Sequence, residues 1–151
     1  MQRVQEVLIQ NEEGTKRLGQ KLAKHLKPGS IVALFGDLGT GKTTLTKAIG
    51  LSLGVTEIIT SPTFTVIHEY RNGVLPLYHF DAYRLQNEKE LLDFGYEEYF
   101  YGQGVTIIEW ADRIEGFLPP ETISIHMYYG ETENQRRYLI QGLDEVELCG
   151  F

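Results

Sequence analysis

A glycine-rich segment followed by a lysine and two threonines most constrains what this chain can fold into. Residues 36–43 read Gly-Asp-Leu-Gly-Thr-Gly-Lys-Thr and fit the pattern G-x-x-x-x-G-K-[ST] at every fixed position. The run Ile31–Phe35 before it is continuously apolar, as in a strand buried on both faces, and a helical pattern follows from Thr44 to Leu53. This strand–loop–helix context predicts a phosphate-binding loop, because the glycines let successive N–H groups face one anion at a helix N-terminus.

The same segment indicates which ligand binds there. Lys42 can reach the β- and γ-phosphates as a point charge, and the Thr43 hydroxyl can complete a magnesium shell beside a phosphate oxygen. The sequences Asn-Lys-x-Asp and Thr-Lys-x-Asp, which select guanine, are absent from the chain, so ATP is favoured over GTP. We therefore expect ATP and Mg²⁺ as cofactors, with nucleotide contacts at Asp37, Leu38, Gly39, Thr40, Gly41, Lys42, Thr43 and Thr44.

Two carboxylates follow predicted buried strands. Asp81 comes after residues 77–80, and Glu109 comes after residues 105–108. P-loop proteins commonly place a carboxylate near magnesium at such a position, and a second one can orient or deprotonate the attacking water. Sequence order does not assign the two roles; we favour Glu109 as the metal ligand with Thr43, and Asp81 as its neighbour. The predicted catalytic residues are thus Lys42, Asp81 and Glu109.

The remaining pattern predicts one α/β domain over residues 1–151, with a P-loop NTPase fold and a mixed β-sheet flanked by helices. Pro76 should put its part of a strand at an edge or a bulge, and Leu91 and Leu92 should face inward from a helix. Residues 96–104 read as a long connection. Further elements are expected at 4–9 (an edge strand), 65–70 with 74–80 (a hairpin), 88–94 (a helix), 105–108 (a strand), and 123–128 with 137–140 (an antiparallel pair).

Charge and composition limit the partners. The formal net charge is −7, with 14 Lys and Arg against 21 Asp and Glu, which argues against a broad footprint for tRNA. Any nucleic acid is then held by a partner. Cys149 is the single cysteine, so no internal disulfide is possible, and the chain has neither a signal-peptide pattern nor a long apolar span. We expect a cytoplasmic protein away from membranes, with ordinary packing or solvent roles for its four histidines. Trp110 is expected to be a packing residue, and its aromatic ring could also serve a partner surface.

Four motifs in order resemble the TsaE family, also called YjeE or YdiB. They are residues 36–45 (GDLGTGKTTL), 61–64 (SPTF), 79–85 (HFDAYRL) and 108–111 (IEWA), so the resemblance spans nearly the whole chain. It implies an ATPase that supports bacterial synthesis of N6-threonylcarbamoyladenosine at position 37 of tRNAs that read codons beginning with A. It further implies a helper that binds the TsaB–TsaD pair and meets tRNA only through that complex.

The resemblance also implies roles for single residues. Gly36 to Thr44 would bind phosphate, Thr43 and Glu109 would hold magnesium, and Asp81 would assist at the metal or the water. Residues 61–63 resemble a switch-like loop. Thr15 and Arg136 resemble positions that border the nucleotide.

Two other functions compete with this one. A small-molecule kinase would need an acceptor pocket and an arginine-bearing lid, and no arginine-rich lid segment is evident in the sequence. A nucleotide-gated binding module would differ mainly in whether a partner stimulates hydrolysis. Because no convincing arginine finger is present in cis, we expect slow turnover by the chain alone. Self-association stays open.

Overall fold

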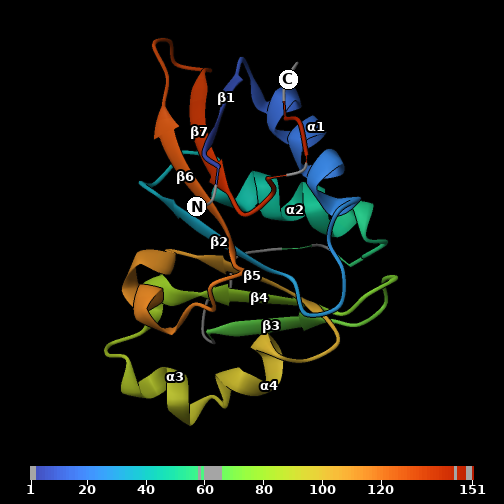
Figure 1. Ribbon diagram of the computed structural model, residues 1–151, viewed down its shortest axis with the longest axis vertical. Helices are drawn as coiled ribbons and strands as arrows, with labels where there is room; N and C mark the ends of the chain where they lie inside the picture. The colour runs from blue at the N-terminus through green and yellow to red at the C-terminus, as the bar shows by residue number, and fades with distance from the viewer. Residues whose placement is uncertain (1–2, 58, 60–65, 145, 149–150) are drawn as a thin grey trace.

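A seven-stranded mixed sheet forms the centre of the molecule (Figure 1). The computed structural model describes residues 3–57, 59, 66–144, 146–148 and 151. The spatial order is β1-β7-β6-β2-β5-β4-β3, in which β2 pairs in parallel with β5 and β6, and β4 pairs in parallel with β5. The other pairs are antiparallel. The strands are β1 (Gln5–Ile9), β2 (Ile31–Gly36), β3 (Ile67–Tyr70), β4 (Leu77–Asp81), β5 (Val105–Glu109), β6 (Ile123–Tyr129) and β7 (Arg136–Gln141).

Helices on the two sides of the sheet create two cores. Successive strand side chains point to opposite faces, so Val32 and Leu34 of β2 join the core under α1 and α2, whereas Ile31, Ala33 and Phe35 join the other. Figure 1 shows α3 and α4 beyond β3 and β4, away from α1 and α2. The helices are α1 (Glu12–Ala23), α2 (Lys42–Ser52), α3 (Lys89–Asp93) and α4 (Tyr96–Phe100), with 3₁₀ helices η1 (Ala82–Arg84) and η2 (Ala111–Phe117). The predicted α/β class with a mixed, helix-flanked sheet is confirmed.

The first helix shows how local sequence places an element beside the P-loop. The Asn11 side chain accepts a hydrogen bond from the Gly14 N–H at 3.0 Å, which satisfies one of the unpaired donors at the start of α1. Glu12 and Glu13 add negative charge at the positive end of this helix. Thr15 lies one turn in and is buried, so the start of α1 faces the phosphate-binding loop.

Three details differ from the sequence predictions. Pro76 lies just before β4 instead of inside it, and its carbonyl accepts from the Val105 N–H at 2.8 Å, so an inner strand needs no bulge. Leu91 is fully buried, but the inward prediction for Leu92 is wrong, because this side chain is 55% exposed on the outer side of a five-residue helix. Residues expected as a long connection include α4, whose Phe100 is buried.

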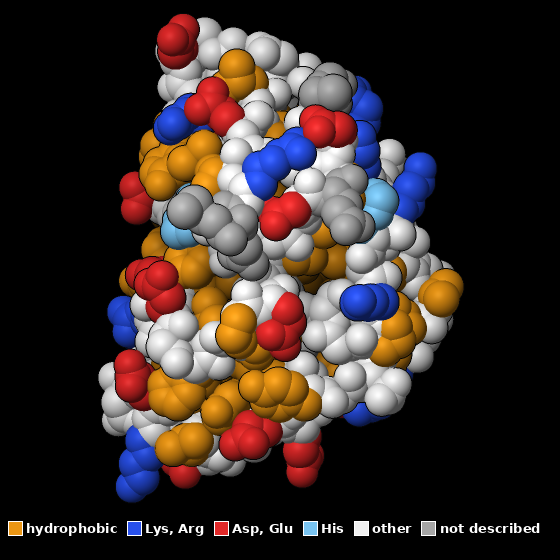
Figure 2. Space-filling view, viewed as in Figure 1, with side chains coloured by type: hydrophobic (Ala, Val, Ile, Leu, Met, Phe, Trp, Pro, Cys, Tyr) orange, Lys and Arg blue, Asp and Glu red, His pale blue; other side chains and the backbone are white. Residues whose placement is uncertain are grey.

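Apolar side chains remain on the surface near the short helices. Figure 2 shows hydrophobic side chains gathered over the lower part of the molecule, where α3 and α4 lie in Figure 1. Leu92 and Phe94 are exposed there. Within the described ranges, none of the helices is both long enough and apolar enough to cross a membrane.

Candidate functional site

The glycine-rich loop joins β2 to α2, as the sequence predicts. Gly39 and Gly41 have φ values of 81° and 105°, a left-handed region that an L side chain seldom adopts. Gly41 is the N-cap of α2 and carries no side-chain cap, so this helix presents its amides to the cavity in front of the loop. The amides of Gly39 and Gly41 donate no hydrogen bond to any other described residue. The loop therefore offers free donors at a positive helix end, the arrangement that binds phosphate groups.

Lys42 lies inside this loop. The residue is 5% exposed, and its Nζ donates to the carbonyl oxygens of Gly36 at 2.6 Å and Asp37 at 2.8 Å. Burial lowers the pKa of the Lys42 ammonium, and the nearby Glu109 carboxylate opposes this shift most strongly. The indole ring of Trp110 covers the ammonium, with 4.0 Å between Nζ and the ring centroid. An ammonium held by two carbonyls and a ring can be transferred to an incoming phosphate without a large backbone change.

The two predicted carboxylates meet at one edge of the sheet. Asp81 and Glu109 are register partners at the ends of parallel strands β4 and β5. Glu109 is 3% exposed; its Oε1 accepts from the Thr43 hydroxyl at 3.1 Å, and its Oε2 lies 2.5 Å from His79 Nε2. The Asp81 carboxylate accepts from the Tyr83 N–H at 3.1 Å at the start of η1. The Thr43 hydroxyl thus donates directly to the Glu109 carboxylate.

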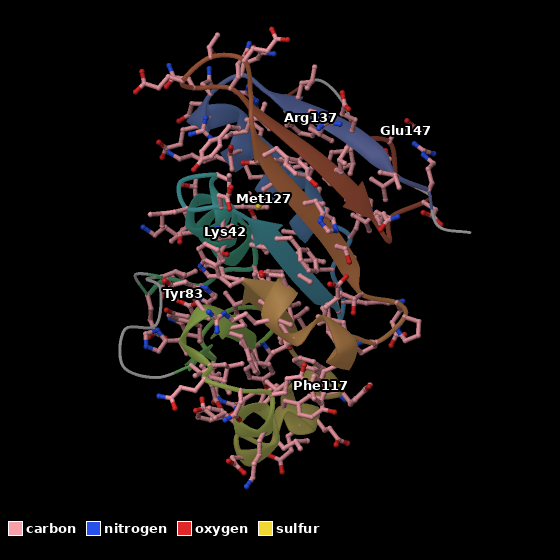
Figure 3. All side chains as sticks on the ribbon, turned by 90° about the vertical axis from the view of Figure 1, so that its left-hand side faces the viewer. Lys42, Tyr83, Phe117, Met127, Arg137 and Glu147 are labelled. Carbon is pink, nitrogen blue, oxygen red and sulfur yellow. The ribbon has the colours of Figure 1, made fainter. Side chains whose placement is uncertain are left out.

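Thr43, Asp81 and Glu109 line one cavity of about 610 Å³ together with Lys42 and Trp110. Figure 3 shows Lys42 and Tyr83, another lining residue, on the same side of the molecule. All three donors are hard oxygens, which magnesium prefers. Across the described residues, no group of three or more His, Cys, Asp or Glu side chains could hold a metal by itself. The donor set therefore fits magnesium that arrives with phosphate oxygens and waters, which uses only one or two protein carboxylates.

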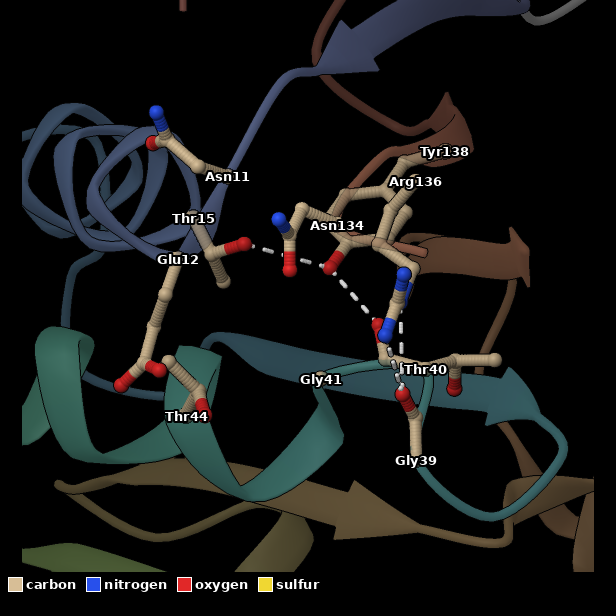
Figure 4. A pocket seen from close by; sticks show the side chains of 10 residues that line it. All are labelled: Asn11, Glu12, Thr15, Gly39, Thr40, Gly41, Thr44, Asn134, Arg136 and Tyr138. Atoms are coloured by element: carbon tan, nitrogen blue, oxygen red, sulfur yellow. Dashed lines mark hydrogen bonds between the residues drawn. The ribbon is translucent and has the colours of Figure 1, made fainter. Parts of the chain in front are cut away.

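A second cavity of about 220 Å³ lies on the other side of the loop (Figure 4). Thr15 comes from α1, Arg136 and Tyr138 come from β7, and Gly39 to Gly41 form its floor. The Thr15 hydroxyl lies 3.4 Å from the Tyr138 hydroxyl, and Arg136 donates to the Gly39 carbonyl at 3.0 Å. The fold thereby brings Thr15 and Arg136 together at the phosphate-binding loop.

Comparison with known proteins agrees with this geometry. The family model described as "Threonylcarbamoyl adenosine biosynthesis protein TsaE" matches residues 9–138. The chain belongs to the TsaE family. The chain is 53% identical over 140 residues to the tRNA threonylcarbamoyladenosine biosynthesis protein TsaE of Bacillus subtilis (strain 168), covering 92% of this chain and 87% of the relative. The protein of the same name from Rickettsia felis is 35% identical over 146 residues, covering 96% and 85%.

A solved structure extends the similarity to the fold. The crystal structure of Bacillus subtilis YdiB superimposes with a TM-score of 0.79 at 40% identity and covers 93% of this chain and 86% of that chain. The TsaE-family assignment and the P-loop NTPase-type fold predicted from the motifs are therefore confirmed. The predicted site residues 38–44, 81 and 109 line the two cavities at this loop, with Thr15 and Arg136 in the smaller one. Asp37 is in the described lining of neither cavity, and its carbonyl accepts from Lys42. The predicted switch-like loop at residues 61–63 lies outside the described residues.

Two residues of this TsaE site were missed by the sequence analysis. His79, predicted to have an ordinary packing role, is fully buried against Glu109. Residues i and i+2 of a strand share a face, so the spacing of His79 and Asp81 was a signal that could have placed His79 beside the carboxylates. Trp110 has φ 58° and ψ 43° and is, among the described residues, the one non-glycine with positive φ. This conformation costs roughly 1–2 kcal/mol and lets the ring face Lys42.

Proposed function

We propose that this TsaE-family protein is a magnesium-dependent ATPase that supports formation of the threonylcarbamoyl group on adenosine 37 of tRNAs reading codons that begin with A. The observation that carries the proposal is the meeting of Lys42, Thr43 and Glu109 in one cavity at the carboxyl ends of β2 and β5. The names of the relatives support the biological role, since each describes tRNA threonylcarbamoyladenosine biosynthesis.

The chain's own residues divide the work of hydrolysis. The amides of the loop bind the phosphates, and Lys42 leaves the Gly36 and Asp37 carbonyls to pair with the β- and γ-phosphate oxygens. Thr43 and Glu109 would hold magnesium, which neutralises charge on these oxygens when bound. Asp81, beside Glu109 in the register, orients the attacking water or accepts its proton.

The adenosine end of ATP belongs on the opposite side of the loop. There Thr15 and Arg136 line the smaller cavity, and residues 39–41 of the phosphate-binding loop line it as well. The kinase alternative would need an acceptor pocket closed by an arginine-bearing lid. The described lining of the larger cavity contains Lys42 as its basic residue and no arginine.

Slow hydrolysis by the isolated chain is expected because the described lining of the larger cavity contains no arginine. An arginine that stabilises the transition state is worth about 10³ to 10⁵ in rate. We infer that a partner completes the site, and that the partner is the TsaB–TsaD pair in the cytoplasm, with tRNA bound through that complex. The net charge of −7 suits a helper that does not grip tRNA by itself.

The test is ATP hydrolysis with magnesium, first by the protein alone and then with TsaB, TsaD and tRNA. We expect slow turnover alone and clear stimulation by the pair. Lys42→Ala should abolish both rates, whereas Lys47→Ala, which removes an exposed lysine of the same helix, should leave them unchanged. Phosphate transfer to a small acceptor without any partner would refute the ATPase and support the kinase.

A further inference from the structure

Three consecutive carbonyl groups of the phosphate-binding loop accept hydrogen bonds from one hairpin. The Tyr129 hydroxyl donates to the Leu38 carbonyl, and the Tyr138 hydroxyl donates to the Thr40 carbonyl at 2.8 Å. Arg136 donates to the Gly39 carbonyl between them, at 3.0 Å from Nη2 and 3.3 Å from Nε. Figure 4 shows Arg136 and Tyr138 reaching from β7 to this loop. We call Tyr129, Arg136 and Tyr138 the carbonyl clamp.

The clamp follows from the register of β6 and β7. Tyr129 and Arg136 are directly opposite each other across the two strands. Arg136 and Tyr138 are two residues apart on one strand and therefore share a face. The hairpin thus presents three donors in a row at the spacing of three successive loop carbonyls.

Fixing a carbonyl also fixes the next amide. In a planar trans peptide the C=O and the following N–H point in opposite directions. The Leu38 carbonyl held by Tyr129 sets the direction of the Gly39 N–H, and the Thr40 carbonyl held by Tyr138 sets that of the Gly41 N–H. These two amides make no hydrogen bond to any described residue, whereas the Thr40 N–H between them already donates to the Asp37 carbonyl at 3.3 Å. The two tyrosines therefore act on the two peptide groups whose donors are free for a ligand.

Burial and close packing make the Tyr138 contact the stronger one. Tyr138 is fully buried, and burial raises the pKa of its phenol, which keeps the hydroxyl protonated as a donor. A Cβ at Gly41 would lie 2.6 Å from the Tyr138 oxygen, so the loop approaches this hydroxyl as closely as a glycine allows. Tyr129 is 54% exposed, and water can replace its hydroxyl.

We propose that Tyr138 and Tyr129 are positioning residues that aim the Gly41 and Gly39 amides at the phosphate groups of the nucleotide. The inference rests on the proposed function, because it assumes that phosphates bind this loop. It adds that phosphate affinity depends on hydroxyl groups at the far side of the loop, which donate to loop carbonyls and not to the phosphate groups.

Removing single hydroxyls tests the proposal. Tyr138→Phe and Tyr129→Phe keep the rings, and Tyr128→Phe makes the same change at a neighbouring exposed tyrosine whose ring lies under Arg137. Titration calorimetry with ADP and with inorganic tripolyphosphate, which probes the phosphate cradle alone, measures affinity. A lost buried hydrogen bond predicts an affinity about tenfold weaker in Tyr138→Phe for both probes, and about twofold to threefold weaker in Tyr129→Phe. Tyr128→Phe should bind as the wild type does.

Glycine amide signals separate positioning from loosened packing. In protein with ¹⁵N-labelled glycine, the Gly39 and Gly41 amide protons should shift downfield when ADP binds. Tyr138→Phe should reduce the Gly41 shift and retain the Gly39 shift, and Tyr129→Phe should do the reverse. An unchanged Gly41 shift in Tyr138→Phe, at any affinity, would overturn the proposal. If Tyr138→Phe does not fold, Tyr129→Phe decides alone through the Gly39 shift, since its exposed ring carries little of the fold.

The wild-type titration distinguishes failure of the positioning role from failure of the proposed function. Binding of ADP and tripolyphosphate by the wild type, together with identical binding by both variants, would overturn the positioning role and leave the proposed function intact. A wild type that binds neither probe would overturn the proposed function, and this inference with it.

Discussion

Replacing His79 with alanine tests whether this buried histidine holds the Glu109 carboxylate. His79 is fully buried on β4, and its Nε2 lies 2.5 Å from Glu109 Oε2. Its Nδ1 has no hydrogen-bond partner among the described residues, so the polar anchoring of the ring depends on Glu109. The alanine variant leaves Glu109, which is 3% exposed, with the Thr43 hydroxyl and an empty space in place of the ring.

The cost can be worked from these contacts. A hydrogen bond to a charged group contributes about 1.5–3 kcal/mol. Removing a buried ring adds a transfer and cavity cost of about 2 kcal/mol. The expected loss in the free energy of unfolding is therefore about 4 kcal/mol, a large share of the roughly 5–15 kcal/mol typical of a domain. A partner that orients a metal-ligating carboxylate is worth about 10–100-fold in activity, so the proposed magnesium-dependent turnover should also fall by this factor.

Urea unfolding at 25 °C and ATP hydrolysis at saturating magnesium measure the two effects. His126→Ala is the matched control, because His126 lies on β6, stacks on Phe35 at 4.4 Å and contacts neither carboxylate in any described interaction. It should cost about 1 kcal/mol through the lost ring contact and leave turnover unchanged. His79→Gln, which restores a donor, should recover part of the turnover. A His79→Ala protein that loses less than about 1 kcal/mol and keeps wild-type turnover would refute the reasoning.

Three further predictions use the same site. Glu109→Gln should remove magnesium-dependent turnover while ATP still binds. Asp81→Asn should still bind ATP more tightly with magnesium than without it. Turnover that survives only in Glu109→Gln would reassign the metal to Asp81. Trp110 is the single tryptophan, and its emission should change when ATP draws the Lys42 ammonium away from the ring, so unchanged emission at saturating ATP would contradict that movement. Burial raises the folded-state pKa of Tyr138 above its usual 10.0, so the contribution of its phenol to stability is complete below pH 10 and is lost as the pH rises further. Chemical denaturation should therefore show that Tyr138→Phe loses less stability than the wild type between pH 9 and 11. Equal losses in the two proteins would count against a buried phenol.

Much of the fold was predictable because its signals are local. The apolar run Ile31–Phe35 became β2, and Asn-Gly at residues 72–73 lies between β3 and β4 as a hairpin signal should. Weak periodicity explains the failures. In the five-residue helix α3, Leu91 and Leu92 are 100° apart around the axis, and only Leu91 turns toward the core, which a single turn of pattern does not distinguish. In the aromatic segment that forms α4, Tyr96, Tyr99 and Phe100 have the helical spacing i, i+3 and i+4 and pack on one core, but five residues give this pattern little more than one turn in which to be recognised.

The candidate site also contains residues that local sequence predicts and contacts that only the tertiary structure creates. The sequence by itself determined the phosphate-binding loop and both carboxylates, since each is a property of a few consecutive residues: glycines where φ is positive, a lysine and a threonine at the helix start, and acids where strands stop. Only the tertiary structure decided that His79 contacts Glu109, that Thr15 approaches Tyr138 across 123 positions, and that one hairpin holds three loop carbonyls. These contacts depend on strand order and register, which arise from long-range pairing and packing that no local pattern in the chain contains.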